Sequence, residues 1–180
     1  EQLQEAAGGM IRLVTVAPEI EGALSFIEQL SSKGIIVALG HTSAGIDLIR
    51  QATDCGALLS THLGNGTASM LSKHDNPILA QLSEDRLSAS FITDGYHLSR
   101  EQFQLYLRAK GPDRTILVTD ATSAAAAVPG VYGLGPMTLE RQQEPVALSP
   151  DTGRPAGSAV TLDQCPVSYT HLRAHETTEH

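Results

Sequence analysis

The sequence has few cysteines, no cluster of basic residues and no long apolar segment, and each shortage excludes a class of protein. Two cysteines, Cys55 and Cys165, are too few for a disulfide framework. The chain also opens without a charged and apolar secretory leader, so we expect a cytoplasmic location. The 12 basic residues form no run and the net charge is -8, which argues against a nucleic-acid partner.

No apolar stretch approaches the roughly 18 residues that a membrane span requires, so we expect no membrane partner. The composition is that of a globular chain, because 41% of the residues are hydrophobic and only 18% are charged. The sequence therefore predicts a folded domain with a packed core.

Apolar runs alternate with amphipathic stretches between residues 12 and 120, as expected for βα units around a parallel sheet. We expect strands at 12–19, 35–39, 57–61, 87–93 and 115–119. We expect helices at 23–30 and 46–52, a short one from Asn76-Pro77, and one from Ser99 to Gly111. After residue 121 the pattern predicts loops and a hairpin, with short strands at 137–139 and 146–148.

Local signals predict where three of these helices begin. Thr42 or Ser43 is expected to cap the helix at 46–52. Proline at position 77 suits the first turn of a helix, where its missing N–H is not needed. Ser99 and Gln102 have the spacing of a capping box.

Chemically useful side chains stand where the predicted strands end. Four of the five strands end on Glu19, His41, His62 or Asp120, and His97 lies just past the remaining one. The carboxyl ends of parallel strands point the same way, so residues distant in sequence converge there. Neutral imidazoles bind zinc or iron and a carboxylate can move a proton, so the pattern predicts metal-assisted hydrolysis.

Six segments together resemble one family. They read TVAPE (15–19), GHTSA (40–44), STHLGN (60–65), ITDGYH (92–97), LVTDAT (117–122) and AGSAVTLD (156–163). In this order they resemble the N-acetylglucosamine-6-phosphate deacetylases, which are metal-dependent amidohydrolases, over about residues 12–164. The resemblance implies an α/β fold that is the C-terminal portion of a TIM (β/α)8 barrel, because a complete barrel needs about 250 residues.

The resemblance also implies roles for the strand-end residues. His41 and His62 match the two histidine ligands of one divalent metal ion, zinc or iron(II). Asp120 matches the catalytic carboxylate, which accepts a proton from the attacking water and delivers it to the departing amine. The family's carboxylate ligand belongs to an earlier motif, so Glu19 is expected to support the site and not to bind metal.

Further residues match segments that hold the amino sugar phosphate. These are Asn65, Gly66, His97, Ala156, Gly157 and Ser158. The loop after the second histidine departs from the family, since it reads Gly-Asn-Gly-Thr where an aromatic usually precedes the asparagine and Ala-Met follows it. The family's basic phosphate ligand is also replaced, and the nearest candidates are Lys73 and His74.

The resemblance ends near residue 164, so we expect a partial barrel domain at 1–164 and a non-native tail at 165–180. The tail contains His171, His175 and His180, but its HETTEH segment satisfies neither HExxH nor HxxEH. With one metal ligand upstream of the chain, we expect these 180 residues alone to show little activity.

We expect the parent protein to hydrolyse the N-acetyl group of N-acetylglucosamine 6-phosphate, and the family implies a homodimer. An alternative is a related amidohydrolase that acts on another N-acyl sugar or a cyclic amide. A further alternative is a fragment that binds sugar phosphate without catalysis.

Overall fold

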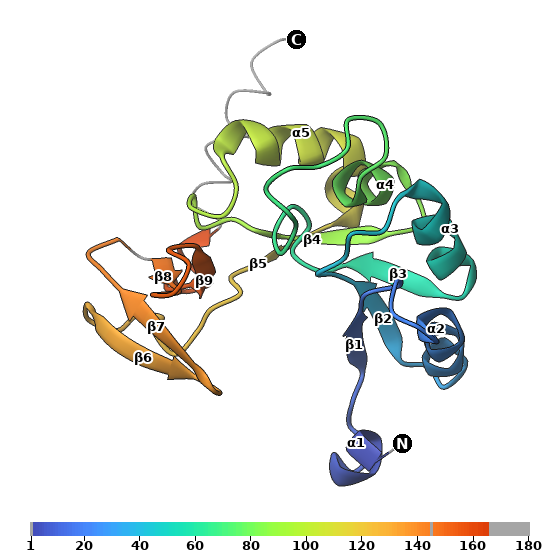
Figure 1. The fold of residues 1–180 in the computed structure, drawn as a ribbon, viewed down its shortest axis with the longest axis horizontal. Coiled ribbons are helices and arrows are strands. Elements are labelled where there is room, and N and C mark those ends of the chain that lie inside the picture. Colours follow the sequence, from blue (N-terminus) through green and yellow to red (C-terminus); the bar gives the residue numbers. More distant parts are fainter. Residues whose placement is uncertain (1, 145, 166–180) are drawn as a thin grey trace. The chain divides into compact units, whose positions relative to one another are not determined.

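The computed structural model describes residues 2–144 and 146–165 (Figure 1). The chain divides into two compact units, one formed by Glu1–Ser90 with Ala109–Thr115 and the other by Phe91–Arg108 with Ile116–His180. The expected tail at 165–180 lies outside the described residues except for Cys165. Within the described residues, no helix is long and apolar enough to span a membrane.

A five-stranded sheet follows the chain in the order β1-β2-β3-β4-β5. Its strands are β1 (Leu13–Val16), β2 (Ile36–Leu39), β3 (Ala57–Ser60), β4 (Ser88–Ile92) and β5 (Thr115–Val118). Neighbouring strands from β1 to β4 pair in parallel, which requires a crossover between each pair. All five expected strands are therefore confirmed, with small differences in their bounds.

Helices fill the crossovers. They are α2 (Ala23–Ser32), α3 (Ile46–Asp54), α4 (Pro77–Ser83) and α5 (Arg100–Lys110), with a 3-10 turn, η1 (Pro112–Arg114), before β5. These match the four expected helices. A short helix before the sheet, α1 (Gln2–Ala6), was not anticipated.

The core of the first unit lies between α2, α3, α4 and the sheet. Figure 1 shows α2 and α3 lying beside the strands. Ile27 and Ile49 on the helices pack with Val37 and Leu39 on β2, and all four are completely buried. On the opposite face of the sheet, Leu13 and Ile36 are register partners and remain 48% and 45% exposed. One face of β1 and β2 is thus covered, and the other is exposed at Leu13 and Ile36 but buried at Ala38.

The second sheet is antiparallel and belongs to the second unit. Its order is β6 (Gly130–Leu134), β7 (Met137–Arg141), β8 (Val146–Leu148) and β9 (Pro155–Ser158). The expected strands at 137–139 and 146–148 correspond to β7 and β8. The sequence did not reveal β6 or β9, because glycine and proline interrupt any apolar alternation there.

The predicted cap of α3 is wrong. Its N-cap residue is Gly45 without a side-chain cap, and Asp75 accepts a hydrogen bond from the Ile46 N–H at 2.7 Å instead. Thr42 and Ser43 are engaged elsewhere, with the Glu19 carboxylate. A carboxylate 29 residues away thus replaces the local cap, which no local signal could reveal.

The other two helix starts are confirmed. Asn76 caps α4, because its side-chain oxygen accepts from the Ile78 and Leu79 N–H groups with proline at the first turn. Ser99 and Gln102 form the reciprocal capping box before α5.

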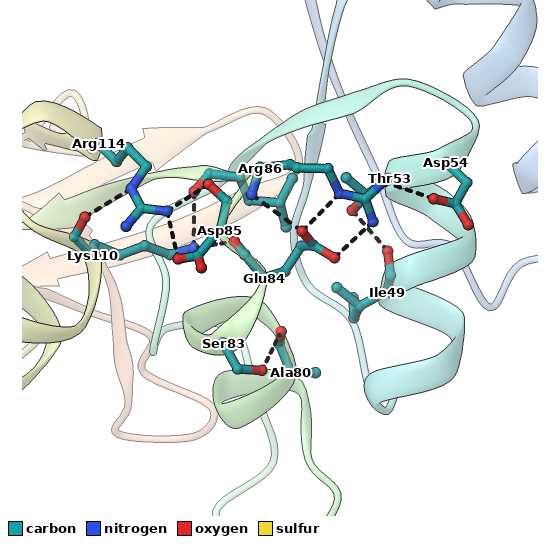
Figure 2. Close-up of polar contacts among 11 residues, drawn as sticks. Ile49, Thr53, Asp54, Ala80, Ser83, Glu84, Asp85, Arg86, Lys110 and Arg114 are labelled. Atoms are coloured by element: carbon teal, nitrogen blue, oxygen red, sulfur yellow. Dashed lines mark hydrogen bonds and ion pairs between the residues drawn. The ribbon is translucent and has the colours of Figure 1, made fainter.

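A polar network surrounds the amino end of β4 in the first unit (Figure 2). The Lys110 side chain is 1% exposed, and its Nζ donates to the carbonyl oxygens of Glu84 at 2.7 Å and Leu87 at 2.8 Å. Burial, followed by the positive charge of Arg114, lowers the pKa of Lys110 to about 8. Arg114 also donates to the Asp85 carboxylate at 2.6 Å.

Arg86 extends this network toward α3. Its guanidinium donates two hydrogen bonds of 2.8 Å to the Glu84 carboxylate and a third of 2.7 Å to Asp54. The bonds from Arg86 lower the pKa of Glu84 to about 2. The network joins the ends of α3, α4 and α5 to the start of β4.

Candidate active site

The predicted metal ligands His41 and His62 meet in the first unit. His41 follows β2 and His62 follows β3, and these strands are parallel neighbours. Their Nε2 atoms lie 3.0 Å apart, and the two rings meet edge to face with centroids 4.7 Å apart. The sheet therefore brings together two imidazoles that are 21 residues apart in the sequence.

The two histidines and the predicted catalytic Asp120 adopt an unusual backbone conformation. His41, His62 and Asp120 have φ angles of 51°, 31° and 53°, in the left-handed region that non-glycine residues rarely occupy. Among the described residues, the only other non-glycine residue with positive φ is Ala126. Such strain typically persists where function requires it, and here it coincides with the three residues expected to carry catalysis.

Buried hydrogen bonds hold His62 in place. Its backbone N–H donates to Ser90 Oγ at 2.8 Å, and the Ser90 hydroxyl donates in turn to the Ser60 carbonyl at 3.1 Å. His62 is 8% exposed, whereas His41 is exposed. The pair therefore has one fixed member and one that solvent can reach.

Glu19 supports the segment that follows His41. Its carboxylate accepts from Thr42 Oγ at 2.5 Å, from the Ser43 N–H at 2.6 Å and from Ser43 Oγ at 3.1 Å. Burial acts to raise the pKa of Glu19, but these hydrogen bonds lower it below its usual value. Glu19 thus anchors the loop from β2 to α3, and its supporting role in the site stays a prediction.

Asn65 and Gly66 lie against the histidine pair. The Asn65 N–H donates to the His62 carbonyl at 3.0 Å, and its side-chain Nδ2 is buried without a hydrogen-bond partner in the described part of the chain. A Cβ at Gly66, which has φ +65°, would stand 2.7 Å from Nδ1 of His41. Only glycine fits this close approach, and Asn65 offers a donor that a ligand could use.

Lys73 and His74 are exposed side chains in the loop before α4. The next residue, Asp75, ties this loop to the start of α3 through the Ile46 N–H. No contact recorded between described residues directs Lys73 or His74 toward the histidine pair. Their role in phosphate binding stays a prediction.

In the second unit, Asp120 lies beside the segment 156–158. The Ser158 N–H donates to the Asp120 carbonyl at 2.9 Å, and the Thr122 N–H donates to the Ser158 carbonyl at 3.0 Å. A Cβ at Gly157 would meet the Thr122 methyl group at 2.4 Å. The structure thus places the predicted Ala156, Gly157 and Ser158 next to the backbone of Asp120, the predicted catalytic residue.

His97 occupies a tight turn after β4 with a partner that sequence reasoning missed. Its Nδ1 lies 2.7 Å from Oδ2 of Asp94, and the side chains are 6% and 0% exposed. In the sequence, Asp94 is only one acidic residue in a turn. Only the structure shows that its carboxylate contacts the His97 ring.

The histidine pair has nearly the spacing of two ligands of one metal ion. Two nitrogens bound to one tetrahedral zinc ion at about 2.0–2.1 Å stand about 3.3–3.4 Å apart, so the imidazoles at 3.0 Å need only a small separation to share an ion. Among the described residues, however, no group of three or more histidine, cysteine, aspartate or glutamate side chains could hold a metal. The pair therefore fits half of a four-ligand site.

Comparisons with known proteins decide the family. The chain is 32% identical over 161 residues to N-acetylglucosamine-6-phosphate deacetylase of Lysinibacillus sphaericus, covering 89% of this chain and 41% of the relative. Its structure matches an aspartate-to-alanine variant of N-acetyl-D-glucosamine-6-phosphate deacetylase from Mycobacterium smegmatis, solved with N-acetyl-D-glucosamine-6-phosphate, at TM-score 0.86 and 35% identity. The chain belongs to the N-acetylglucosamine-6-phosphate deacetylase family.

The match covers 91% of this chain and 43% of the Mycobacterium protein, so the chain spans about two fifths of the relatives' length. N-acetylgalactosamine-6-phosphate deacetylase of Escherichia coli O157:H7 is also similar, at 31% identity over 163 residues, covering 91% of this chain and 42% of the relative. No protein-family profile matches the chain. The relatives thus include deacetylases of two different amino sugar phosphates.

Proposed function

We propose that the protein to which this chain belongs hydrolyses the N-acetyl group of N-acetylglucosamine 6-phosphate. Water adds its oxygen to the acetyl carbon, the amide C–N bond breaks, and the products are acetate and glucosamine 6-phosphate. The observation that carries the proposal is the 3.0 Å approach of the two imidazoles at neighbouring strand ends. Membership of the deacetylase family supports the choice of reaction.

In this proposal His41 and His62 hold one divalent ion, zinc or iron(II), which lowers the pKa of water and polarises the acetyl carbonyl. Asp120 accepts a proton from the attacking water on its carboxylate and delivers it to the leaving nitrogen. Glu19 fixes the loop that carries His41. Each of these side chains has a distinct task, so each can be tested separately.

Substrate binding is assigned to the residues that match the family's substrate-binding segments. Asn65 contributes its buried Nδ2, and Gly66 leaves room for His41. His97 and the Ala156–Ser158 segment contact the sugar, and Lys73 or His74 pairs with the phosphate. Asn65 is best supported among them, because a buried donor without a partner costs roughly 1–3 kcal/mol that a ligand would recover.

We further propose that residues 1–164 are the C-terminal portion of a (β/α)8 barrel. The parallel strands follow each other in sequence order, as in a barrel and unlike a doubly wound sheet, where the order reverses. The exposed face at Leu13 and Ile36 supports this, since the side chains inside a closed barrel cover one another.

A second candidate substrate is N-acetylgalactosamine 6-phosphate, which the similarity to the Escherichia coli protein favours. The two sugars differ only in the configuration of one hydroxyl. The altered Gly64–Thr67 loop lies beside His41, where it could affect this choice.

The test is acetate release by the full-length protein after chelation and addition of zinc or ferrous iron. The substrates are both sugar phosphates and unphosphorylated N-acetylglucosamine. We expect metal-dependent turnover with strong preference for N-acetylglucosamine 6-phosphate. Preference for the galactosamine substrate would favour the second candidate, and activity on none of the three would reject the proposal.

The Asp120→Asn variant tests the proton transfer in the same assay. We expect it to lose most turnover while its metal content stays unchanged, because the amide cannot accept the proton. Near-normal turnover would remove Asp120 from the mechanism.

A further inference from the structure

The turn after β4 is built around the Asp94 carboxylate. Oδ1 accepts hydrogen bonds from the Tyr96 N–H at 2.9 Å and the His97 N–H at 3.0 Å, while Oδ2 faces Nδ1 of His97 at 2.7 Å. The Asp94 side chain is fully buried. One carboxylate therefore organises both the backbone of the turn and the imidazole that the turn carries.

The charge of Asp94 determines which nitrogen of His97 carries hydrogen. Burial acts to raise the pKa of Asp94, but the hydrogen bonds from the His97 ring and the two N–H groups lower it to about 2. At neutral pH both carboxylate oxygens are therefore acceptors only. The hydrogen between Oδ2 and Nδ1 must then belong to the imidazole.

The other ring nitrogen is left for a ligand. Within residues 2–144 and 146–165, the contacts of His97 are to Asp94, and none involves Nε2. A histidine whose Nδ1–H is held by a carboxylate presents Nε2 in a fixed direction. Catalytic and metal-binding histidines are commonly oriented in this way, by a hydrogen bond from the ring nitrogen that does not face the ligand.

We propose that Asp94 is a positioning residue that fixes the Nδ1–H tautomer of His97 and thereby presents Nε2, as a hydrogen-bond acceptor, to a hydroxyl group of the amino sugar phosphate. The proposal rests on the proposed function for its ligand. Its structural half, the tautomer, depends on the turn and not on the proposed function. The two halves can therefore fail separately.

The test of the structural half is the tautomer of His97, read from the ¹⁵N shifts of its ring in the 180-residue chain above the pH of imidazole protonation. We expect the Nδ1–H form. In Asp94→Asn the amide oxygen can still accept from the turn N–H groups, but its NH₂ donates toward Nδ1. We therefore expect the variant to switch to the Nε2–H form.

Glu144→Gln is the matched control, because Glu144 accepts from Tyr96 Oη at 2.5 Å in the same region without touching His97. We expect this variant to keep the wild-type tautomer. An Nε2–H form in the unmodified chain would overturn the proposal. This measurement does not depend on whether any variant folds. An unchanged tautomer in Asp94→Asn would overturn it too.

The ligand half is tested in the full-length protein with N-acetylglucosamine 6-phosphate. We expect Asp94→Asn to raise KM about tenfold or more with a smaller change in kcat, and Glu144→Gln to change neither. An unchanged KM would overturn this half of the proposal. Absence of turnover in the unmodified enzyme would instead reject the proposed function and leave the tautomer result standing.

Discussion

The two ends of the parallel strands in the first unit are built on different principles. At the carboxyl ends, His41 and His62 face each other in left-handed conformations beside a buried amide donor that has no partner among the described residues. At the amino end of β4, the buried Lys110 ammonium has two carbonyl acceptors and ion pairs surround it (Figure 2). Strain and spare hydrogen-bonding capacity mark the first end, and satisfied polar groups mark the second.

This contrast separates function from stability. In barrel enzymes the carboxyl ends of the strands carry the chemistry and the amino ends contribute to stability. Substitutions at the Lys110 network should therefore cost folding free energy. Substitutions at the histidine pair should cost metal binding and should sometimes stabilise the chain.

The largest effect on stability is expected for Lys110→Met, which keeps the aliphatic stem and removes the donor from two buried carbonyls. Each unsatisfied group costs roughly 1–3 kcal/mol, so for the two carbonyls we expect unfolding to require about 2–6 kcal/mol less free energy. Urea denaturation measures it. Lys73→Met, at an exposed lysine, is the control and should stay near wild type. Equal stability of both variants would break the comparison.

Gly66→Ala should have the next largest effect. Its Cβ would stand 2.7 Å from His41 Nδ1, so the ring must move away from His62. Gly153→Ala is the matched control, because Gly153 has the same φ of +65° and open space around it. We expect both variants to lose about 1 kcal/mol for the backbone conformation and only Gly66→Ala to weaken zinc binding. Equal zinc affinity would show that the pair tolerates displacement.

The pH dependence of stability should distinguish Lys110 from other groups. Its pKa is about 8 in the folded chain, whereas the ordinary value for a lysine side chain, taken for the unfolded chain, is 10.5. Between these pH values the unfolded chain therefore binds more protons than the folded chain. Its contribution to stability is therefore present above pH 10.5 and is lost as the pH falls through 8. The difference in unfolding free energy between wild type and Lys110→Met should grow over this window in alkaline buffers. A flat difference would contradict the burial of the charge.

The smallest effect is expected for His41→Gly and Asp120→Gly. Glycine adopts their φ angles without strain, so relief of the backbone should stabilise the chain by about 1 kcal/mol. Thermal unfolding measures it, with Ala125→Gly as a control at a residue whose own φ is not positive. Destabilisation of both variants beyond this control would show that their conformations carry no strain.

Sequence patterns predicted much of the fold because they are local. Apolar runs and helix stripes located β1 to β5 and α2 to α5, and strand ends pointed to His41, His62 and Asp120. The features that were missed depend on distant partners. Asp75 caps α3 from another loop, and Lys110 would be taken for a solvated residue at a helix end although it is buried.

The candidate site was predicted in the same uneven way. The histidine pair follows from the parallel order of β2 and β3, so its meeting could be expected before the structure. The role of Asp94 could not, because an acidic residue beside glycine is usual in a turn. The assignments of Lys73 and His74 rest on resemblance and stay predictions.

The most direct test of the site at the carboxyl ends is a zinc titration of the 180-residue chain, followed through the imidazole signals of His41 and His62. We predict that both signals shift together at the same zinc concentration, and that His62→Ala abolishes the shift of His41. Independent shifts, or no shift at either residue while the protein remains folded, would contradict a shared metal site at this end of the sheet.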